Sequence, residues 1–378
     1  MKILLTGSHF TPAQAVINEF KNYSDLSLVY LGRRSTREGD KTLSVESQVL
    51  PELGVKFIPI TAGRLQRSFT IHTIPSLLKI PIGIFQSFYF VLKEQPDVVL
   101  SFGGYVAVPV VISSWLLSIP IIIHEQTLVS GLANTICSLF ADKIAVSFKS
   151  HSLKGEKVIV TGNPIRQEIT ESSSQIPQDL EIKNIIQLVK KENLPLVLIT
   201  GGNQGSHVIN QAVAEILGDL TKIAFVVHQT GDSKFQDFEK LTEQQKTLKY
   251  PQRYIAKKWV GGADFGAVLQ NADLVISRAG VNTLLELAYF GIPTLVIPIP
   301  YLYKDEQNVN AKFFEKSGLV KILSQKDLSG KNLQDEVLKM LKDLDHLKKE
   351  AKKAREVVIS DAAKRLVLET LLLAKIQK

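Results

Sequence analysis

The stretch from Asp273 to Ala311 restricts the fold of this chain more than any other part of the sequence. It begins with an apolar run, turns at Arg278-Ala279-Gly280 into a helical pattern, and breaks at Gly291-Ile292-Pro293 into a second apolar run. A strand, a helix and a second strand in that order form a βαβ unit, which belongs to a parallel sheet. Since ligands of such sheets bind at the carboxyl ends of the strands, we expect a binding site beside these turns.

The helix that follows Gly280 carries groups suited to a nucleotide. Its first backbone N–H groups have no partner within the helix and lie at the positive end of the helix dipole, so they can bind an anion. Glu286 shares a helical face with Asn282 and Thr283, and a carboxylate there can accept hydrogen bonds from both hydroxyls of a ribose. An ordinary crossover helix with one surface glutamate has the same spacing, so both interpretations stay open at this point.

The same alternation of apolar runs and helical segments fills the rest of the 378 residues. Strands are expected at 2–6, 26–31, 55–60, 97–101, 120–124, 143–147 and 157–161, and again at 196–200, 223–228, 254–259, 274–277, 294–298 and 319–323. Residues 98–123 carry no charge, but their glycines and prolines divide them into strand, turn, helix and strand. The length and the pattern predict two doubly wound α/β domains that face each other across a cleft.

Composition excludes several kinds of site. Lys and Arg outnumber Asp and Glu by 45 to 37, yet no aromatic-interleaved basic surface accompanies the net charge of +8, so we expect no nucleic acid partner. The single cysteine, Cys137, excludes an internal disulfide and a multi-cysteine metal site. The only Asp-x-Asp sequence, Asp343-Leu344-Asp345, lies in a Lys-rich helical segment, so we expect neither a metal nor another cofactor.

Several expected strands end in glycine-rich turns, in both halves of the chain. These turns are residues 6–9, 101–105, 161–166 and 200–205, and the polar segment 124–127 follows a further strand. One such turn is a weak signal, but together they predict a cleft lined by glycines, amides and imidazoles. The first half has no clean G-x-G-x-x-G and no segment matches a Walker loop, which argues against a dinucleotide or ATP.

Six segments, in this order and spacing, resemble a known family over nearly the whole chain. They are GGYV at 103–106, HEQ at 124–126, GNPIR at 162–166, GGNQGSHVINQ at 201–211, RAGVNTLLELAYFGIP at 278–293 and DEQNVNA at 305–311. The chain resembles the peripheral membrane glycosyltransferases of peptidoglycan synthesis. That family transfers N-acetylglucosamine, with inversion, from UDP-N-acetylglucosamine to the 4-hydroxyl of undecaprenyl-diphospho-N-acetylmuramoyl pentapeptide (lipid I), which gives lipid II.

The resemblance implies a GT-B architecture, in which two Rossmann-like domains face a central cleft. Residues 1–166 would bind the acceptor and associate with the membrane, 167–194 would be a linker region, and 195–355 would bind the donor. Residues 356–378 would form a C-terminal helix that returns to the first domain. The resemblance also implies three partners, UDP-N-acetylglucosamine, a polyprenyl-diphosphate-linked acceptor and the membrane surface, and a peripheral position on the cytoplasmic face of the cell membrane.

Carried over to this sequence, the family pattern assigns most donor contacts to the second half. Glu286 would bind the ribose hydroxyls, while Gln307 and Asn308 would orient the sugar. The backbone of Val260 would hold the uracil. The remaining expected contacts, to the diphosphate and its surroundings, are Arg166, Asn203, Val281, Asn282, Thr283, Leu284 and Leu285.

His9 is the leading candidate for the general base, because a neutral imidazole can accept a proton near pH 7. It could equally bind phosphate or cap the helix that follows. Glu125 is the second candidate, and it could instead be a structural hydrogen-bonding residue. Thr6, Gly7, Ser8 and Thr127 are the expected acceptor contacts. The first loop, TGSH, is two residues shorter than the family's GGTGGH, and Thr127 and Asn203 replace the usual Asn and Ser.

A membrane-bound acceptor requires a docking surface, and residues 64–92 combine apolar side chains with nearby cations. We expect Lys79, Ile82 and Phe85 to form part of it, although such residues could also pack inside the domain. Two other functions stay open: another UDP-sugar enzyme of the same architecture, such as a glycolipid transferase or a sugar-nucleotide epimerase, and a non-catalytic membrane-associated subunit that binds a sugar nucleotide.

Overall fold

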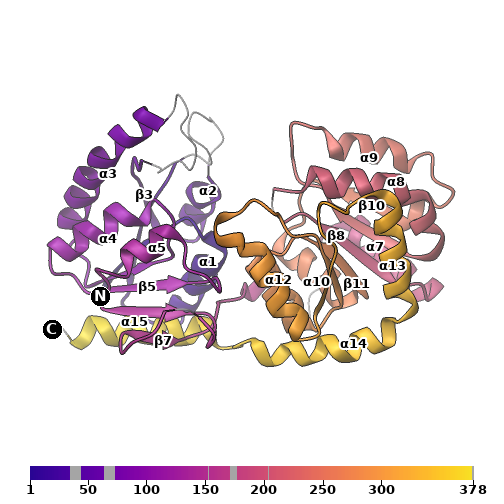
Figure 1. Ribbon diagram of the computed structural model, residues 1–378. Coiled ribbons are helices and arrows are strands. Elements are labelled where there is room, and N and C mark those ends of the chain that lie inside the picture. Colours follow the sequence, from indigo (N-terminus) through magenta and orange to yellow (C-terminus); the bar gives the residue numbers. More distant parts are fainter. Residues whose placement is uncertain (35–43, 64–72, 152, 171–176, 203, 377–378) are drawn as a thin grey trace. The chain divides into compact units, whose positions relative to one another are not determined.

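The computed structural model describes residues 1–34, 44–63, 73–151, 153–170, 177–202 and 204–376, without the side chains of 73–78 and 376. The chain forms two compact units (Figure 1). Unit 1 comprises Met1–Ile165 and Ile359–Lys378, and unit 2 comprises Arg166–Val358. Each unit is a parallel sheet flanked by helices, so the predicted pair of Rossmann-like domains is confirmed.

The sheet of unit 1 has the strand order β3-β2-β1-β4-β5-β6-β7. Its strands are β1 (Lys2–Thr6), β2 (Ser27–Gly32), β3 (Lys56–Pro59), β4 (Val98–Ser101), β5 (Ile121–Glu125), β6 (Lys143–Val146) and β7 (Val158–Val160). Separate hydrophobic clusters cover its two faces, which explains the uninterrupted apolar runs of the central strands. The order reverses direction between β1 and β4, and such a switch point is where open α/β sheets bind ligands.

The helices of unit 1 include one from the far end of the chain. They are α1 (Phe10–Phe20), α2 (Val45–Glu52), α3 (Thr73–Glu94), α4 (Ala107–Leu116), α5 (Leu132–Cys137) and α15 (Ala362–Ile376). The C-terminal helix α15 packs against α1 and β4 and buries Leu366 and Val367 in the core of unit 1. Gly162 has φ +87°, and a Cβ there would lie 2.6 Å from Cβ of Ile359, so the returning chain approaches this turn closely.

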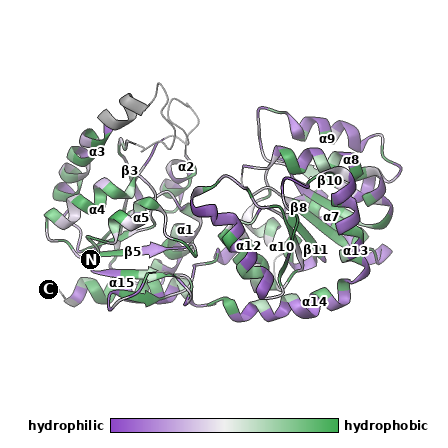
Figure 2. Ribbon diagram, in the orientation of Figure 1, coloured by the Kyte–Doolittle hydropathy of each residue, from purple (hydrophilic) through white to green (hydrophobic). Residues whose placement is uncertain are grey.

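The sheet of unit 2 has the order β10-β9-β8-β11-β12-β13, with a switch point between β8 and β11. Its strands are β8 (Leu196–Thr200), β9 (Phe225–Gln229), β10 (Tyr254–Lys257), β11 (Leu274–Ser277), β12 (Thr294–Val296) and β13 (Val320–Ile322). Figure 2 shows hydrophobic residues on β8 and β11 at the centre of this unit and hydrophilic ones on α9 at its surface.

The helices of unit 2 occupy the intervals between these strands. They are α6 (Gln167–Thr170), α7 (Leu180–Glu192), α8 (His207–Ile223), α9 (Asp237–Gln245), α10 (Gly262–Asn271), α11 (Val281–Phe290), α12 (Glu306–Lys316), α13 (Gly330–Lys342) and α14 (Leu344–Lys353). Within the described part of this unit, short 3₁₀ helices are η2 (Pro251–Arg253), η3 (Tyr303–Asp305) and η4 (Ala354–Val357).

The predicted strands all occur within a few residues of their expected bounds, and the uncharged stretch 98–123 forms β4, α4 and most of β5. The expected linker region at 167–194 was wrong in its described part. Asp179 caps α7 through its side chain, and Ile182 and Ile185 are buried, so this segment is an amphipathic helix of unit 2. The polar composition of residues 167–176 concealed the apolar face that follows them.

Candidate active site

The switch point of unit 2 carries an open helix N-terminus. The strand β11 ends at Ser277, and α11 begins at Val281 after Gly280. A Cβ at Gly280 would meet nothing within 4 Å, so the approach to the first turn of α11 is unobstructed. The first N–H groups of an α-helix have no intrahelical acceptor, which makes this end suitable for a diphosphate.

The residues of α11 divide into two groups. Asn282 and Thr283 are partly exposed beside the open N-terminus, whereas Val281, Leu284 and Leu285 are buried in the core. The buried side chains therefore pack inside unit 2, and only the main chain of those positions is available to a ligand. Glu286, which follows Leu285, is the charged residue among the buried residues of α11.

Glu286 is 3% exposed and forms an ion pair with Arg166. Both Nε and Nη2 of Arg166 lie 3.0 Å from the same carboxylate oxygen, Oε1. Burial raises the pKa of Glu286, and the guanidinium of Arg166 opposes that rise. The guanidinium also lies 5.9 Å from the ring centroid of Phe265. Arg166 therefore holds one oxygen of Glu286, Oε1, and these contacts leave the other oxygen, Oε2, to other partners.

The expected uracil and loop contacts lie at neighbouring strand ends. Val260 is buried, and its main-chain N–H donates to Oε1 of Gln229, at the end of β9 (3.1 Å). Asn203 lies outside the described residues. Gly205, two residues later, is tightly packed, because it has φ +71° and a Cβ there would lie 1.9 Å from the carbonyl oxygen of Thr230. Gln229 was not a predicted site residue, although a polar residue closing an apolar strand was a signal for it.

The expected sugar contacts, Gln307 and Asn308, lie in the first turn of α12. Gln307 is buried, and its Oε1 accepts from the N–H groups of Ala279 (3.3 Å) and Ile299 (3.0 Å). Asn308 donates to Oδ1 of Asp305, which adopts a left-handed φ of +53°. These bonds fix the start of α12 against the turn that precedes α11. Sequence inspection associated both residues with the sugar but did not predict this anchoring role.

The switch point of unit 1 brings two glycine turns together. Ser8 donates its N–H to the carbonyl of Gly103 (2.9 Å), and a Cβ at Gly104 would lie 1.8 Å from Oγ of Ser8. Gly7 has φ +142°, and a Cβ there would meet Phe102 at 2.9 Å. Thr6 is fully buried, so its side chain is enclosed, while Ser8 remains partly exposed. The close fit leaves room only for glycine at these positions.

His9 follows this turn at the N-terminus of α1 and is partly exposed. Its Nδ1 lies 2.9 Å from Nε2 of Gln126. Burial, together with the charge of Arg33, lowers the pKa of His9 to about 4, so the imidazole is neutral near pH 7. Its side chain makes no capping hydrogen bond to α1. Gln126 was quoted in the sequence only as part of HEQ, and its contact with His9 was not predicted.

Glu125 is 2% exposed, and each of its carboxylate oxygens has two partners. Oε1 accepts from N (3.1 Å) and Oγ1 (2.8 Å) of Thr127, and Oε2 accepts from Gly131 N (3.3 Å) and Asn134 Nδ2 (3.0 Å). Burial raises the pKa of Glu125, and these hydrogen bonds oppose the rise. The carboxylate therefore organises the loop after β5, and the hydroxyl of Thr127 is part of the same network.

The apolar face of α3 is exposed along one stripe. Ile82 is 48% exposed and Phe85 76%, and the spacing of three and four residues continues to Tyr89 and Leu92, which are 57% and 52% exposed. Lys79 is partly exposed near one end of the stripe. Residues 64–72 of the expected docking stretch lie outside the described residues. Among the helices that are described, none is both long and apolar enough to cross a bilayer.

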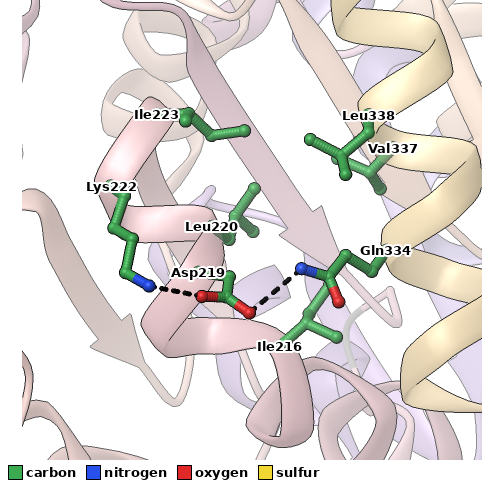
Figure 3. Close-up of a pocket in the computed structure, with 8 residues that line it drawn as sticks. All are labelled: Ile216, Asp219, Leu220, Lys222, Ile223, Gln334, Val337 and Leu338. Carbon is green, nitrogen blue, oxygen red and sulfur yellow. Dashed lines mark hydrogen bonds and ion pairs between the residues drawn. The ribbon is translucent and has the colours of Figure 1, made fainter.

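A cavity of about 350 Å³ lies between α8 and α13 (Figure 3). Its lining is mostly apolar and consists of Ile216, Asp219, Leu220, Lys222, Ile223, Gln334, Val337 and Leu338. Because α8 starts at the glycine loop and runs back along the sheet, these residues lie away from the carboxyl ends of the strands. Asp219 pairs with Lys222 (2.6 Å) and accepts from Gln334 (3.1 Å), so we assign the cavity no part in the active site.

Two family models match the chain. Residues 6–146 match the glycosyltransferase family 28 N-terminal domain, and residues 196–366 match the glycosyltransferase family 28 C-terminal domain. A crystal structure of Acinetobacter baumannii MurG superimposes with a TM-score of 0.73 at 24% identity, covering 98% of this chain and 99% of that chain. At this identity the likeness establishes the fold.

Two curated relatives carry one name, UDP-N-acetylglucosamine–N-acetylmuramyl-(pentapeptide) pyrophosphoryl-undecaprenol N-acetylglucosamine transferase. The protein of Clostridium kluyveri is 34% identical over 90% of this chain and 91% of its own length. The protein of Natranaerobius thermophilus is 31% identical over 98% of this chain and 100% of its own length. The similarity therefore extends over both units.

Proposed function

Because the chain belongs to the family 28 glycosyltransferases that transfer N-acetylglucosamine from UDP-N-acetylglucosamine to lipid I, forming lipid II of peptidoglycan, we propose how its residues divide this reaction. Unit 2 binds the donor, and unit 1 binds the acceptor. The observation that carries this assignment is the buried Glu286–Arg166 ion pair on the helix whose open N-terminus faces the switch point of unit 2.

The donor is held at three places in this proposal. Oε2 of Glu286 accepts from the ribose hydroxyls, and the N–H groups at the start of α11 bind the diphosphate. The main chain of Val260 contacts the uracil through its carbonyl, because its N–H already donates to Gln229. Gln307 and Asn308, anchored at the start of α12, border the sugar.

His9 is the proposed general base. The 4-hydroxyl of the acceptor attacks the anomeric carbon of N-acetylglucosamine while the bond to UDP breaks. The attacking oxygen transfers its proton to Nδ1 of His9, which gives up its hydrogen bond from Nε2 of Gln126 in this step. A single displacement of this kind inverts the anomeric configuration. Negative charge grows on the β-phosphate as UDP departs, and the N-terminal dipole of α11 stabilises it.

Glu125 is less suited to that task than His9. Four hydrogen bonds already occupy its carboxylate, and accepting a substrate proton would disrupt the loop that they hold. His9 combines partial exposure with a pKa that keeps it neutral. The acceptor diphosphate would then contact Ser8 and the glycine turns beside it, on a loop shorter than the usual one.

We place the membrane-facing surface on α3. The stripe Ile82, Phe85, Tyr89 and Leu92 offers apolar side chains to the interface, and Nζ of Lys93 lies 5.9 Å from the ring centroid of Tyr89. An exposed apolar stripe with cations beside it suits partial insertion into an anionic leaflet. Trp115 and Leu139, which are 51% and 75% exposed in the same unit, would extend this surface.

The test is UDP release from UDP-N-acetylglucosamine in the presence and absence of a lipid I analogue. We expect release only when the acceptor is present, with a matching disaccharide product. An isomerised UDP-sugar formed without acceptor would instead identify an epimerase. Donor binding without any turnover would identify a non-catalytic subunit.

A further inference from the structure

The side chain of Gln229 joins three neighbouring strand ends in unit 2. Gln229 is the last residue of β9, which lies between β8 and β10 in the sheet. Its side chain is 3% exposed and lies at the carboxyl edge, where the glycine loop and the segment containing Val260 begin. Gln229 is therefore buried beneath the surface of the donor site.

Both the oxygen and the nitrogen of the Gln229 side-chain amide form hydrogen bonds. Oε1 accepts from the N–H of Val260 (3.1 Å), while Nε2 donates to the carbonyl of Gly202 (3.1 Å) and approaches Oγ1 of Thr200 (3.4 Å). The same Oγ1 of Thr200 accepts from the N–H of Gly202 (3.1 Å). One side chain thus connects the segment after β10 with the glycine loop after β8.

Only a side-chain amide of this length can form all of these hydrogen bonds. A glutamate has the acceptor for Val260 but no donor for Gly202, and its second oxygen would face a carbonyl. A methionine has neither a strong donor nor a strong acceptor. A valine at Thr200 removes the hydroxyl that Gly202 and Gln229 share but leaves Val260 bound to Gln229.

We propose that Gln229 is a positioning residue that fixes the spacing between the uracil site at Val260 and the glycine loop that includes Gly202. This inference rests on the proposed function, because it assumes that the donor spans both segments. With the spacing fixed, UDP-N-acetylglucosamine binds to a preformed site. If Gln229 does not fix this spacing, the ligand must order the loop that includes Gly202 when it binds. The affinity for the donor then falls.

The experiment compares Gln229→Glu, Gln229→Met and Thr200→Val with the wild-type enzyme. Gln244→Met is the matched control, because Gln244 also donates from Nε2 to a main-chain carbonyl, that of Ala214 (2.8 Å), but does so from α9. Steady-state kinetics give KM for UDP-N-acetylglucosamine and kcat, and calorimetric titration gives the affinities for UMP and for UDP-N-acetylglucosamine. Thermal unfolding reports whether each variant is folded.

For Gln229→Glu and Thr200→Val we expect KM for the donor to rise about tenfold while kcat changes less than about threefold, as for the loss of one buried hydrogen-bonding contact. The affinity for UMP should change little, because Val260 keeps its partner. Gln229→Met should weaken both ligands, and Gln244→Met neither.

Equal losses of UMP and donor affinity in Gln229→Glu, or an unchanged KM in Thr200→Val, would overturn the positioning role. If the wild-type enzyme itself failed to bind UDP-N-acetylglucosamine, the proposed donor site would fail instead. The two failures are therefore distinguishable in one set of measurements.

Discussion

Glu286 and Arg166 form a buried ion pair across 120 positions of the chain. A buried carboxylate is expensive to ionise, and its cationic partner supplies the compensation. The sequence identified both residues as donor contacts but associated them with different parts of the donor. In the proposed donor site, this contact gives Arg166 the role of opposing the rise that burial causes in the pKa of Glu286.

Replacing Arg166 should make donor binding depend on pH. In Arg166→Met the pKa of Glu286 rises further, because burial raises it and Arg166 no longer opposes the rise. A protonated Glu286 loses acceptor capacity, so the affinity for UDP-N-acetylglucosamine should fall as the pH decreases and recover as it increases. Calorimetric titration from about pH 6 to about pH 9 measures this, with a loss of about tenfold expected at the acidic end.

Arg166→Lys is the control for this prediction, since it retains a positive charge at the same position. It should give a smaller pH dependence than Arg166→Met. An affinity for the donor that is independent of pH in Arg166→Met would contradict the role given to the ion pair.

Burial and, to a smaller extent, the charge of Arg33 should set the acidic limit of activity if His9 is the base. A base must be unprotonated, so activity decreases as the pH falls through the pKa of His9, which is lowered to about 4. Nε of Arg33 lies 3.6 Å from Oε1 of Glu46. The double variant Arg33→Met/Glu46→Gln therefore removes both charges of this ion pair together. The His9 pKa should then rise, and the acidic limb of the kcat/KM profile should shift to higher pH.

Substitution of His9 itself completes this test. In His9→Ala, kcat should fall about 100-fold or more, as expected for the loss of a general base. Measurement of kcat/KM across pH in both variants decides the question. An unshifted acidic limb in the double variant, together with near-normal turnover in His9→Ala, would assign His9 to phosphate binding or to the structure of the loop.

At the level of elements, the loop after β5 depends on one carboxylate. Glu125 satisfies donors from Thr127, Gly131 and Asn134, and these groups lose their acceptor when the carboxylate is removed. Glu125→Ala should therefore lower the free energy of unfolding by about 3 kcal/mol, the scale of buried polar groups left without partners. Denaturant unfolding measures this change.

The same residue separates a structural role from a catalytic one. Glu125→Gln keeps the shape of the side chain, and below its melting temperature it should retain kcat within about fivefold, because no proton transfer is lost. A folded Glu125→Gln enzyme with kcat reduced more than about 100-fold would instead support Glu125 as the base.

The elements themselves were largely predictable from the sequence. Strands of a parallel sheet are buried on both faces, so each appears as an unbroken apolar run, and the glycine turns mark where it ends. The segment around α7 was the exception. Its polar approach suggested a linker, and only the burial of Ile182 and Ile185 shows that it belongs to the core of unit 2.

At the scale of the whole molecule, an enzyme with a lipid-linked acceptor has to meet the membrane. The proposed surface is on α3, and the double variant Ile82→Glu/Phe85→Glu should abolish binding to anionic vesicles, because charged side chains do not enter the apolar part of the interface. Turnover with a short-chain, water-soluble acceptor analogue should be retained. Vesicle flotation and the soluble assay measure the two properties separately.

Leu180→Glu is the matched control, because Leu180 is an exposed leucine of unit 2, 71% accessible, on α7. It should bind vesicles as the wild type does. Equal binding by the α3 double variant and this control would remove α3 from the proposed surface.

The sequence by itself determined the parallel sheets, the positions of most strands, the glycine turns and the family, because these depend on local periodicity and on segments read in order. The tertiary structure decided what the polar residues among them do. It brought Arg166 to Glu286, supplied four hydrogen-bond donors to the carboxylate of Glu125, and placed Gln229 between two loops. The contacts of Arg166 and Gln229 join residues far apart in the chain, so they depend on strand order and packing, which no local pattern of residues specifies. The contacts of Glu125 stay within one loop, and they depend on how that loop folds over the buried carboxylate.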